Sequence, residues 1–397
     1  MPPLSPEALA ARQLELDRER TRRFPSLLSR KQGRMSASPF AFLRGAAPLF
    51  YEILAQVPEL ADGPAGEGWL AGDLHLENFG AYSPARSAGV DKRAAAFNLN
   101  DFDEAVRGPW RVDLLRLLTS LILAGRELGV SGPIALGLGA RLLESYVATV
   151  FQGTPLPVPP SSVATLVERV ASRPRRALLD ARTVVSGGKR RFVRGERYLD
   201  LPPDTLAALP GALETYVLDV APEERPRLDQ MAIIDAAHRV AGTGSLGVLR
   251  VAVLTLGKGA PDGHWIFDLK EQSDPSATSL AGATELSPAE RVVTAFRACV
   301  APPPRLLGTS RLEASELLGR RLTPQEDKLD LRQLKPETLG PLALYLGALV
   351  GTAHSRGASA KPTVAWSPAE QREVLRSAAR MASLHEAIYL EWCFLLQ

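Results

Sequence analysis

The chain has 397 residues, which is long enough for two or three domains with buried cores. Its hydrophobic fraction of 45% and charged fraction of 23% are typical of a globular protein, and a net charge of +3 does not mark a nucleic-acid-binding protein by itself. Two cysteines, Cys299 and Cys393, exclude a disulfide framework and a thiolate metal site. We find no apolar run that approaches the length of a membrane span, and the charged N-terminal stretch lacks a signal-peptide core. We therefore expect a cytoplasmic protein with no membrane partner.

The first half of the chain is predicted to be mainly helical and to contain two short strands. The prediction rests on apolar residues at helical spacing, with proline near the helix starts and glycine near the ends. Each strand runs into a polar loop, and the arginine-rich N-terminal helix is expected to be peripheral. The helices are placed at 1–34, 38–56, 110–129 and 133–150, and the strands at 68–82 and 95–106.

The periodicity changes in the second half of the chain. A proline-rich linker at 155–162 leads into a region, 163–240, that is predicted to be mainly helical. Runs of β-branched and aromatic residues then indicate a hairpin, because a turn-rich segment separates them. The strands are placed at 247–256, 264–270 and 328–334, and the later helices at 287–299, 339–355 and 367–390.

The first candidate site is the segment GDLHLEN, from Gly72 to Asn78. Asp73 and Asn78 have the spacing of a kinase catalytic loop, in which the aspartate accepts the substrate hydroxyl proton and the asparagine holds magnesium. That spacing alone is common, but the preceding glycine and His75 make the pattern more specific. We therefore predict that Asp73 and Asn78 are catalytic, and that Asn78 is also a metal ligand.

The second candidate site is the segment NDFDEA, from Asn100 to Ala105. Three acids within four positions repel one another unless a cation neutralises them. Asp101 occupies the place of the metal-binding aspartate that follows a kinase catalytic loop, and Asp103 is a second candidate ligand. The alternative is a solvated turn whose acids cap a helix.

The third candidate site is the segment GTGSLG, which supplies five candidate phosphate-binding residues: Gly242, Thr243, Gly244, Ser245 and Gly247. A dinucleotide-binding fold would require these glycines to open a helix. A strand-like run follows them instead. The glycines are therefore predicted to lie at the tip of a β-hairpin, as in the kinase loop that covers the ATP phosphates.

Lys270 ends the predicted strand that follows this hairpin. A kinase carries at that place the lysine that contacts the α- and β-phosphates. Only eight of the 47 basic residues are lysines, so a lysine in an apolar strand is unusual for this chain. An exposed strand-end lysine is the alternative. The sequence leaves open whether Glu285 or Glu290, near the next helix, orients Lys270.

These motifs resemble those of the bacterial family catalogued as domain of unknown function 2252, over about residues 20–390. The resemblance rests on the segments SPFAFLRGAA, GDLHLENFG, NDFDEA with the following GPWRVDLLRL, and GTGSLG. That family is similar in turn to the protein-kinase-like superfamily, especially to its aminoglycoside phosphotransferase branch. The resemblance implies a two-lobed, kinase-like α+β fold, and it implies that Asp113 braces the catalytic loop.

The order of the motifs differs from that of a kinase, in which the glycine loop and the lysine strand come first. A circular permutation accounts for this order, with residues 329–334 as the candidate hinge. We expect four parts: an arginine-rich helix at 1–34, a mostly helical lobe at 35–234, a small antiparallel nucleotide-binding lobe at 235–335, and C-terminal helices at 336–397 that pack on the helical lobe.

The predicted function is an ATP- and magnesium-dependent phosphotransferase that acts on an unidentified hydroxyl acceptor, either a small molecule or a protein. Two alternatives stay open. The first is a nucleotide-binding pseudokinase with a regulatory role. The second is a nucleic-acid-associated protein that uses the ten basic residues of segment 169–197. A run of charge is more often a solvated face than a binding site, which disfavours a nucleic-acid partner.

Overall fold

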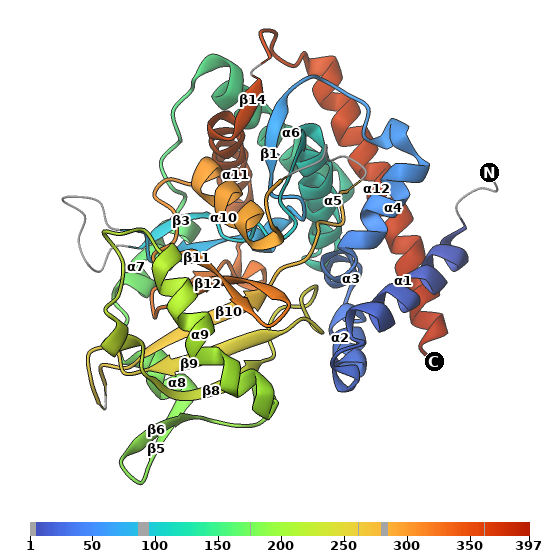
Figure 1. Ribbon diagram of the computed structural model, residues 1–397. Coiled ribbons are helices and arrows are strands. Elements are labelled where there is room, and N and C mark those ends of the chain that lie inside the picture. Colours follow the sequence, from blue (N-terminus) through green and yellow to red (C-terminus); the bar gives the residue numbers. More distant parts are fainter. Residues whose placement is uncertain (1–4, 86–94, 175, 261, 279–284, 361) are drawn as a thin grey trace.

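The computed structural model describes residues 5–85, 95–174, 176–260, 262–278, 285–360 and 362–397. The fold is mixed α+β, with small antiparallel sheets. A six-stranded sheet and the helix that covers it form one part of the molecule, which we call the sheet lobe (Figure 1). A group of longer helices forms the other part, which we call the helical lobe.

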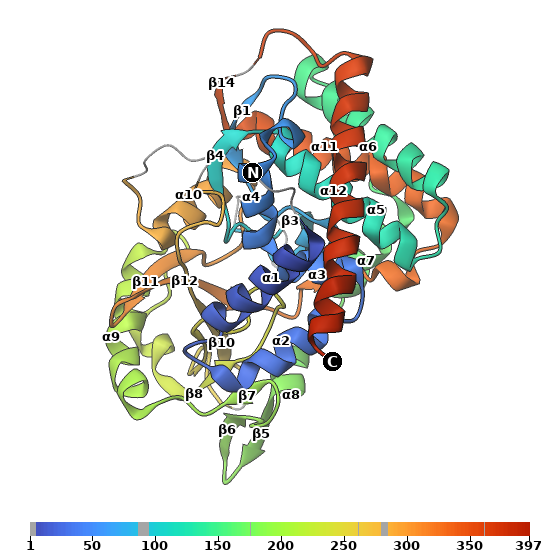
Figure 2. The ribbon, with the colours of Figure 1, turned by 90° about the vertical axis from the view of Figure 1, so that its right-hand side faces the viewer.

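The helical lobe is built around α5, Arg111–Glu127, whose leucines are buried on nearly every side. A helix that is apolar all round belongs in a core. The surrounding helices are α3 (Pro39–Gly45), α4 (Ala47–Gln56), α6 (Gly132–Gln152), α7 (Ser161–Ala171), α11 (Pro336–Arg356) and α12 (Pro368–Leu395). Figure 2 shows α12 crossing the lobe beside α5 and α6, with which it is in contact. Gly347 lets α11 approach α6 closely, because a Cβ there would collide with the carbonyl oxygen of Leu142.

Helix α6 has the length and composition of a membrane span, with a mean hydropathy of 1.4 over 18 residues. This finding corrects the expectation that no apolar run approaches such a span. One side of α6, which includes Leu142, Leu143 and Tyr146, is buried within the fold, and 33% of the 18-residue window is buried. A single helix of this kind is therefore weak evidence for a membrane.

The six-stranded sheet is antiparallel throughout, in the order β11–β12–β10–β9–β8–β7. Its elements are β7 (Tyr198–Leu199), β8 (Ile233–Arg239), β9 (Arg250–Thr255), β10 (Trp265–Glu271), β11 (Gly308–Leu312) and β12 (Ser315–Leu322), with helix α10 (Pro288–Cys299) between β10 and β11 in the chain. Helix α9, Pro203–Asp219, covers one face, where Tyr216 packs against Phe267. Because side chains alternate along a strand, Asp268 and Lys270 lie on the opposite face, toward the helical lobe.

Two three-stranded sheets hold the first two candidate sites, Gly72–Asn78 and Asn100–Ala105, next to each other. Strand β1 (Glu67–Leu70) pairs with β4 (Val106–Pro109) and β14 (Ala358–Ala360), whereas β2 (Phe79–Tyr82) pairs with β3 (Ala96–Leu99) and β13 (Asp327–Lys328). The segment Gly72–Asn78 lies between β1 and β2. The segment Asn100–Ala105, which we call the acidic loop, lies between β3 and β4. Since β1 pairs with β4 and β2 pairs with β3, the two loops leave the sheets side by side.

The N-terminal segment differs from the single peripheral helix that was predicted. It forms α1 (Pro6–Arg20) and α2 (Leu28–Met35), separated by a 3₁₀ turn at Pro25–Leu27, because a proline cannot continue a helix from within. It is also not peripheral, since Gln13 and Asp17 of α1 are buried. Residues 38–56 likewise divide into two helices, α3 and α4.

The region 163–240 is not mainly helical, which corrects a further prediction. The basic stretch contains the short helix α8 (Ala177–Arg182) and a hairpin of β5 (Thr183–Ser186) and β6 (Lys189–Phe192). Gly187 and Gly188 turn this hairpin with positive φ values, which glycine adopts without strain. The six-stranded sheet includes β7 and β8, which begin before residue 235, where the nucleotide-binding lobe was expected to start.

The predicted hairpin of 247–256 and 264–270 is confirmed by β9 and β10. The strand predicted at 328–334 is wrong beyond β13, because a 3₁₀ turn forms at Leu331–Gln333. The hairpin of β11 and β12 was not predicted. Its segment EASELL, 313–318, consists largely of good helix formers, and pairing with β10 overrides that local preference.

Candidate active site

A buried carboxylate fixes the loop from Gly72 to Asn78. Asp113, in the first turn of α5, accepts hydrogen bonds from the backbone N–H groups of Ala71 at 2.7 Å and Gly72 at 3.0 Å. Nε2 of His354 lies 3.3 Å from the same carboxylate. Gly72 has a φ of +80°, and a Cβ there would collide with the backbone of the acidic loop. These contacts confirm the expectation that Asp113 braces the loop from Gly72 to Asn78.

Asp73 lines the central cavity and is paired with a buried arginine of α5. Nε of Arg116 donates a hydrogen bond to Oδ1 of Asp73 at 2.6 Å, and Nη2 of Arg116 donates to the carbonyl oxygen of Leu43 at 2.9 Å. Burial raises the pKa of Asp73 to about 6, although Arg116 lowers it and Glu104 adds to the rise. The carboxylate is therefore mainly ionised at neutral pH, as a general base must be.

His75 and Asn78 shape the loop through hydrogen bonds to its backbone. Nδ1 of His75 accepts from the N–H of Glu77 at 3.2 Å, and Oδ1 of Asn78 accepts from the N–H of His75 at 2.8 Å. Burial holds the pKa of His75 well below its ordinary value, so the imidazole is neutral. Arg44 of α3 contacts the same loop, through an ion pair of 2.6 Å with Glu77.

The acidic loop is fixed by contacts from the sheet lobe. The N–H of Asp103 donates to Oδ1 of Asp101 at 3.3 Å, which tightens the turn. Arg291 of α10 donates to the carbonyl oxygen of Asp103 at 2.9 Å, and the carboxylate of Glu104 accepts the N–H of Ser276 at 2.6 Å. These contacts do not fit the alternative of a solvated turn.

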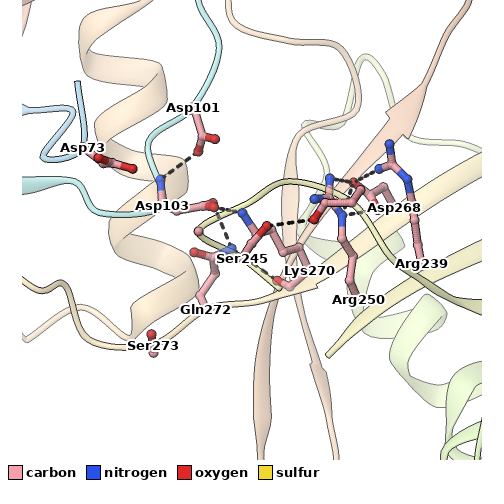
Figure 3. A network of polar contacts seen from close by, with 12 residues as sticks. Asp73, Asp101, Asp103, Arg239, Ser245, Arg250, Asp268, Lys270, Gln272 and Ser273 are labelled. Carbon is pink, nitrogen blue, oxygen red and sulfur yellow. Dashed lines mark hydrogen bonds and ion pairs between the residues drawn. The ribbon is translucent and has the colours of Figure 1, made fainter. Parts of the chain in front are cut away.

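Lys270 of β10 reaches across to the acidic loop and forms an ion pair with Asp103 (Figure 3). Nε2 of Gln272 donates to the same carboxylate at 3.2 Å. Burial lowers the pKa of Lys270 to about 8, while Asp101 raises it. The alternative of an exposed strand-end lysine is therefore wrong.

Neither of the two glutamates considered from the sequence forms an ion pair with Lys270 in the described part of the chain. Glu290 closes the capping box at the start of its own helix, where the N–H of Ser287 donates to it at 2.9 Å. Glu285 forms no ion pair with Lys270 within the described ranges, whose nearest gap is 279–284. The carboxylate that meets Lys270 comes instead from the loop between β3 and β4.

The glycines connect β8 to β9, which are antiparallel neighbours, so their predicted place in a hairpin connection is confirmed. Gly242 and Gly247 have φ values of +79° and +103°, which side chains with a Cβ rarely adopt. The N-terminal helices cover this segment. Arg34 donates to the carbonyl oxygen of Gly242, and Nε of Arg20 donates to that of Gly244 at 3.4 Å. A Cβ at position 247 would collide with the backbone of Arg20.

The predicted site residues line one cavity of about 580 Å³, between the two lobes and the N-terminal helices. They are Asp73, Asn78, Asp101, Asp103, Gly242, Thr243, Gly244, Ser245, Gly247 and Lys270. In Figure 3, Asp73 and Asp101 lie on one side of the view and Lys270 extends toward Asp103 from the other. Two segments of the chain that are far apart in sequence therefore meet in this cavity.

Several residues around the cavity were not predicted. Arg116 could have been found, because it interrupts a run of leucines in α5. Lys31 of α2 and Asp17 of α1 form an ion pair of 3.0 Å in which both side chains are almost fully buried. Their pairing depends on how two helices pack, so no local pattern in the sequence could have indicated it.

The oxygen donors fit a magnesium ion whose coordination is completed by a ligand. Magnesium is usually held by one or two carboxylates together with water and substrate phosphates. Asp101 and Asp103 line the cavity and carry carboxylates, and Asn78 lines it with an amide whose Oδ1 already accepts the N–H of His75. In the described part of the chain, no three His, Cys, Asp or Glu side chains form a metal site made by protein alone. A cation here would need oxygen atoms from water or substrate.

Comparison with known proteins identifies the family. Residues 23–393 match the family model described as "Uncharacterized protein conserved in bacteria (DUF2252)". The match covers nearly the whole chain, so the protein belongs to this family, as the motifs had indicated. No curated protein and no solved structure matches the chain.

Proposed function

We propose that this protein is an ATP- and magnesium-dependent phosphotransferase that acts on an unidentified hydroxyl acceptor. The observation that carries the proposal is that Asp73, Asp101, Lys270 and the Gly242–Gly247 segment all line one cavity. A phosphotransferase needs a base, a cation ligand and a phosphate cover around a single phosphoryl group, and these residue types can supply all three.

The order of elements in the sheet lobe supports a kinase-like, circularly permuted fold as part of this proposal. The glycine segment joins β8 to β9, the next strand β10 carries Lys270, and helix α10 follows. A kinase has the same order of glycine loop, lysine strand and helix. The catalytic and acidic loops come before these elements here, as a permuted chain would place them.

The proposed reaction divides the work among the cavity residues. Asp73 accepts the proton of the acceptor hydroxyl while that oxygen forms a bond to the γ-phosphorus and the bond to ADP breaks. Arg116 holds the Asp73 carboxylate in place, and Lys270 contacts the phosphate chain beneath the glycine segment. Asn78, Asp101 and Asp103 would hold magnesium, which neutralises charge on the phosphate oxygens. The rate enhancement then comes from positioning and charge neutralisation, with no covalent intermediate.

The nucleic-acid alternative has less support, because much of the basic stretch is engaged within the protein. Five of its arginines form ion pairs with acidic residues of the same chain: Arg169, Arg173, Arg176, Arg190 and Arg194. The pseudokinase alternative shares the whole site and differs from the enzyme only in having no turnover.

Calorimetric titration with ATP in the presence and absence of magnesium tests the proposal. We expect binding that requires magnesium, and ATP hydrolysis or transfer to pooled hydroxyl compounds that Asp73→Asn stops. The matched control is Asp204→Asn, an exposed aspartate of α9, which leaves both unchanged. If no nucleotide binds, the proposal is wrong. If ATP binds and no condition gives turnover, the pseudokinase alternative replaces it.

A further inference from the structure

A second, smaller cavity of about 200 Å³ adjoins the candidate active site beneath the glycine segment. We call it the inner cavity. It shares six lining residues with the larger cavity, so a ligand held at Lys270 can extend into it: Asp101, Asp103, Gly242, Ser245, Lys270 and Lys328. Eight of its fourteen lining residues are charged. The cations are Arg239, Arg250, Lys270, Arg320 and Lys328, and the acids are Asp101, Asp103 and Asp268.

A buried carboxylate between two arginines forms the sheet side of the inner cavity (Figure 3). Nε of Arg250 lies 2.9 and 3.1 Å from the two oxygens of Asp268, and Nη1 of Arg239 lies 2.7 Å from Oδ2. Asp268 is 2% exposed. Burial raises its pKa, but Arg239 and Arg250 outweigh that effect and hold the pKa below its ordinary value. Asp268 is therefore ionised, and one carboxylate serves two guanidinium groups.

This arrangement is unsuitable for a nucleobase. A base is a flat, weakly polar ring that proteins usually hold between apolar side chains. Next to Lys270 the sheet presents Asp268, Arg239 and Arg250 instead, and placing a ring there would remove water from charged groups. The apolar residues further along this face of the sheet, such as Ile266, are already covered by Leu179 and Phe192 from the α8–β6 segment.

The same lining suits phosphate groups. The cations outnumber the acids, and a guanidinium is the side chain best matched to a phosphate, because it donates parallel hydrogen bonds from a planar fork. Nε of Arg239 is buried and has no hydrogen-bond partner in the described part of the chain. Arg320, on the neighbouring strand β12, has a side chain that is 24% exposed, and its guanidinium lies 3.6 Å from the carboxylate of Glu326. It takes no part in the two ion pairs of Asp268 with Arg239 and Arg250.

We propose that the inner cavity is an anion subsite for consecutive phosphate groups, and that the phosphoryl donor is recognised through its polyphosphate chain with little contribution from a base. The inference rests on the proposed function, whose donor it describes more closely. The shared ligand chemistry is a linear triphosphate, which a nucleoside triphosphate and an inorganic polyphosphate both provide.

Calorimetry on the full chain with magnesium and ATP, GTP, CTP, tripolyphosphate or adenosine tests this inference. We expect the four triphosphates to bind within about threefold of one another and adenosine not to bind. Arg320→Gln should weaken every triphosphate about tenfold, as the loss of one charge-assisted contact does. Arg311→Gln, in the exposed side chain of the adjacent strand β11, is the matched control and should change nothing. Lys328→Gln, at a residue that lines both cavities, provides a second variant if Arg320→Gln does not fold.

The outcomes separate this inference from the proposed function. If ATP binds and GTP, CTP and tripolyphosphate bind more than about thirtyfold more weakly, a base site exists, and only the inference is overturned. If the folded cavity variants bind ATP as the parent protein does, the inner cavity does not hold phosphate, and the inference again fails alone. If no triphosphate binds, the proposed function fails and the inference fails with it.

Discussion

The Nε of Arg116 donates a hydrogen bond to Oδ1 of Asp73 at 2.6 Å, which joins the candidate base to the core of the helical lobe. Arg116 is fixed on other sides as well, since it donates to the carbonyl oxygen of Leu43 and its guanidinium lies 4.7 Å from the ring centre of Phe50. The position of Asp73 therefore depends on helices α3, α4 and α5, which lie outside the Gly72–Asn78 loop itself.

Breaking this pair should weaken the fold. Arg116→Met leaves the Asp73 carboxylate without its partner, and we expect the free energy of unfolding to fall by about 2 kcal/mol. That value is set below the usual cost of breaking a buried pair because the Asp73 side chain is 22% exposed. Urea denaturation measures the change. Arg372→Met, at an exposed arginine of α12, should stay within about 0.5 kcal/mol of the parent protein. Equal effects of the two variants would contradict a stabilising role for the pair.

The proposed reaction should lose activity in mild acid. Asp73 acts as a base only when ionised, and burial raises its pKa to about 6, so kcat/KM should fall about tenfold per pH unit below that value. Arg116 lowers this pKa, so Arg116→Met should move the acid limb to higher pH. A pH series of kcat/KM for both proteins measures the shift. A limb that stays in place in the variant would show that another group sets the profile.

Lys270 and Asp101 should act on the same chemical step. Lys270→Ala should reduce kcat/KM about a hundredfold, and Asp101→Asn should abolish most of the magnesium-dependent turnover. Because both residues act on one phosphoryl transfer, the double variant should lose less than the product of the two single losses. Steady-state kinetics of the four proteins gives the coupling. Lys335→Ala, at an exposed lysine, is the control that should retain full activity. Fully multiplicative losses would argue against a shared site.

The glycine segment should not tolerate a side chain at position 247. Gly247 combines a φ of +103° with contact to the backbone of Arg20, so Gly247→Ala should cost about 2 kcal/mol of stability. It should also speed tryptic cleavage of the arginine-rich N-terminal helices, which lose their packing surface. Gly211→Ala, in α9 with open space around its Cα, should instead stabilise the protein by about 0.5 kcal/mol. If Gly247→Ala leaves the free energy of unfolding unchanged, the N-terminal helices are not packed against the glycine segment.

The features predicted from the sequence are those that local spacing determines. Asp73 and Asn78 share one loop, the glycines share one connection, and Lys270 follows a recognisable hairpin, so each motif could be found without knowing the fold. The change of hydrophobic periodicity near residue 247 indicated both helices and strands, and the family resemblance implied the α+β class. The hairpin of β11 and β12 was not predicted, because its residues favour a helix unless a neighbouring strand pairs with them.

The partnerships between distant segments could not be predicted in this way. Lys270 was expected to meet a glutamate of the following helix, and it meets Asp103 because the acidic loop extends across the space between the lobes. The first 34 residues appeared peripheral because their arginines dominate the pattern. The buried pair of Lys31 and Asp17 becomes visible only when two helices are packed together. Long-range pairings of this kind depend on tertiary structure, and one sequence alone contains no record of them.

The contact between Arg20 and the carbonyl oxygen of Gly244 spans 224 residues of chain. A ribosome releases the catalytic loop and its supporting helix α5 long before it has made the glycine segment and Lys270. The Asp103 carboxylate of a half-made chain therefore lacks its partner Lys270, and the cavity can form only after more than half of the protein has been synthesised. Closing such a long stretch of chain is slow relative to forming local helices. Biosynthesis thus postpones any chemistry at Asp73 until the two ends of this contact have met.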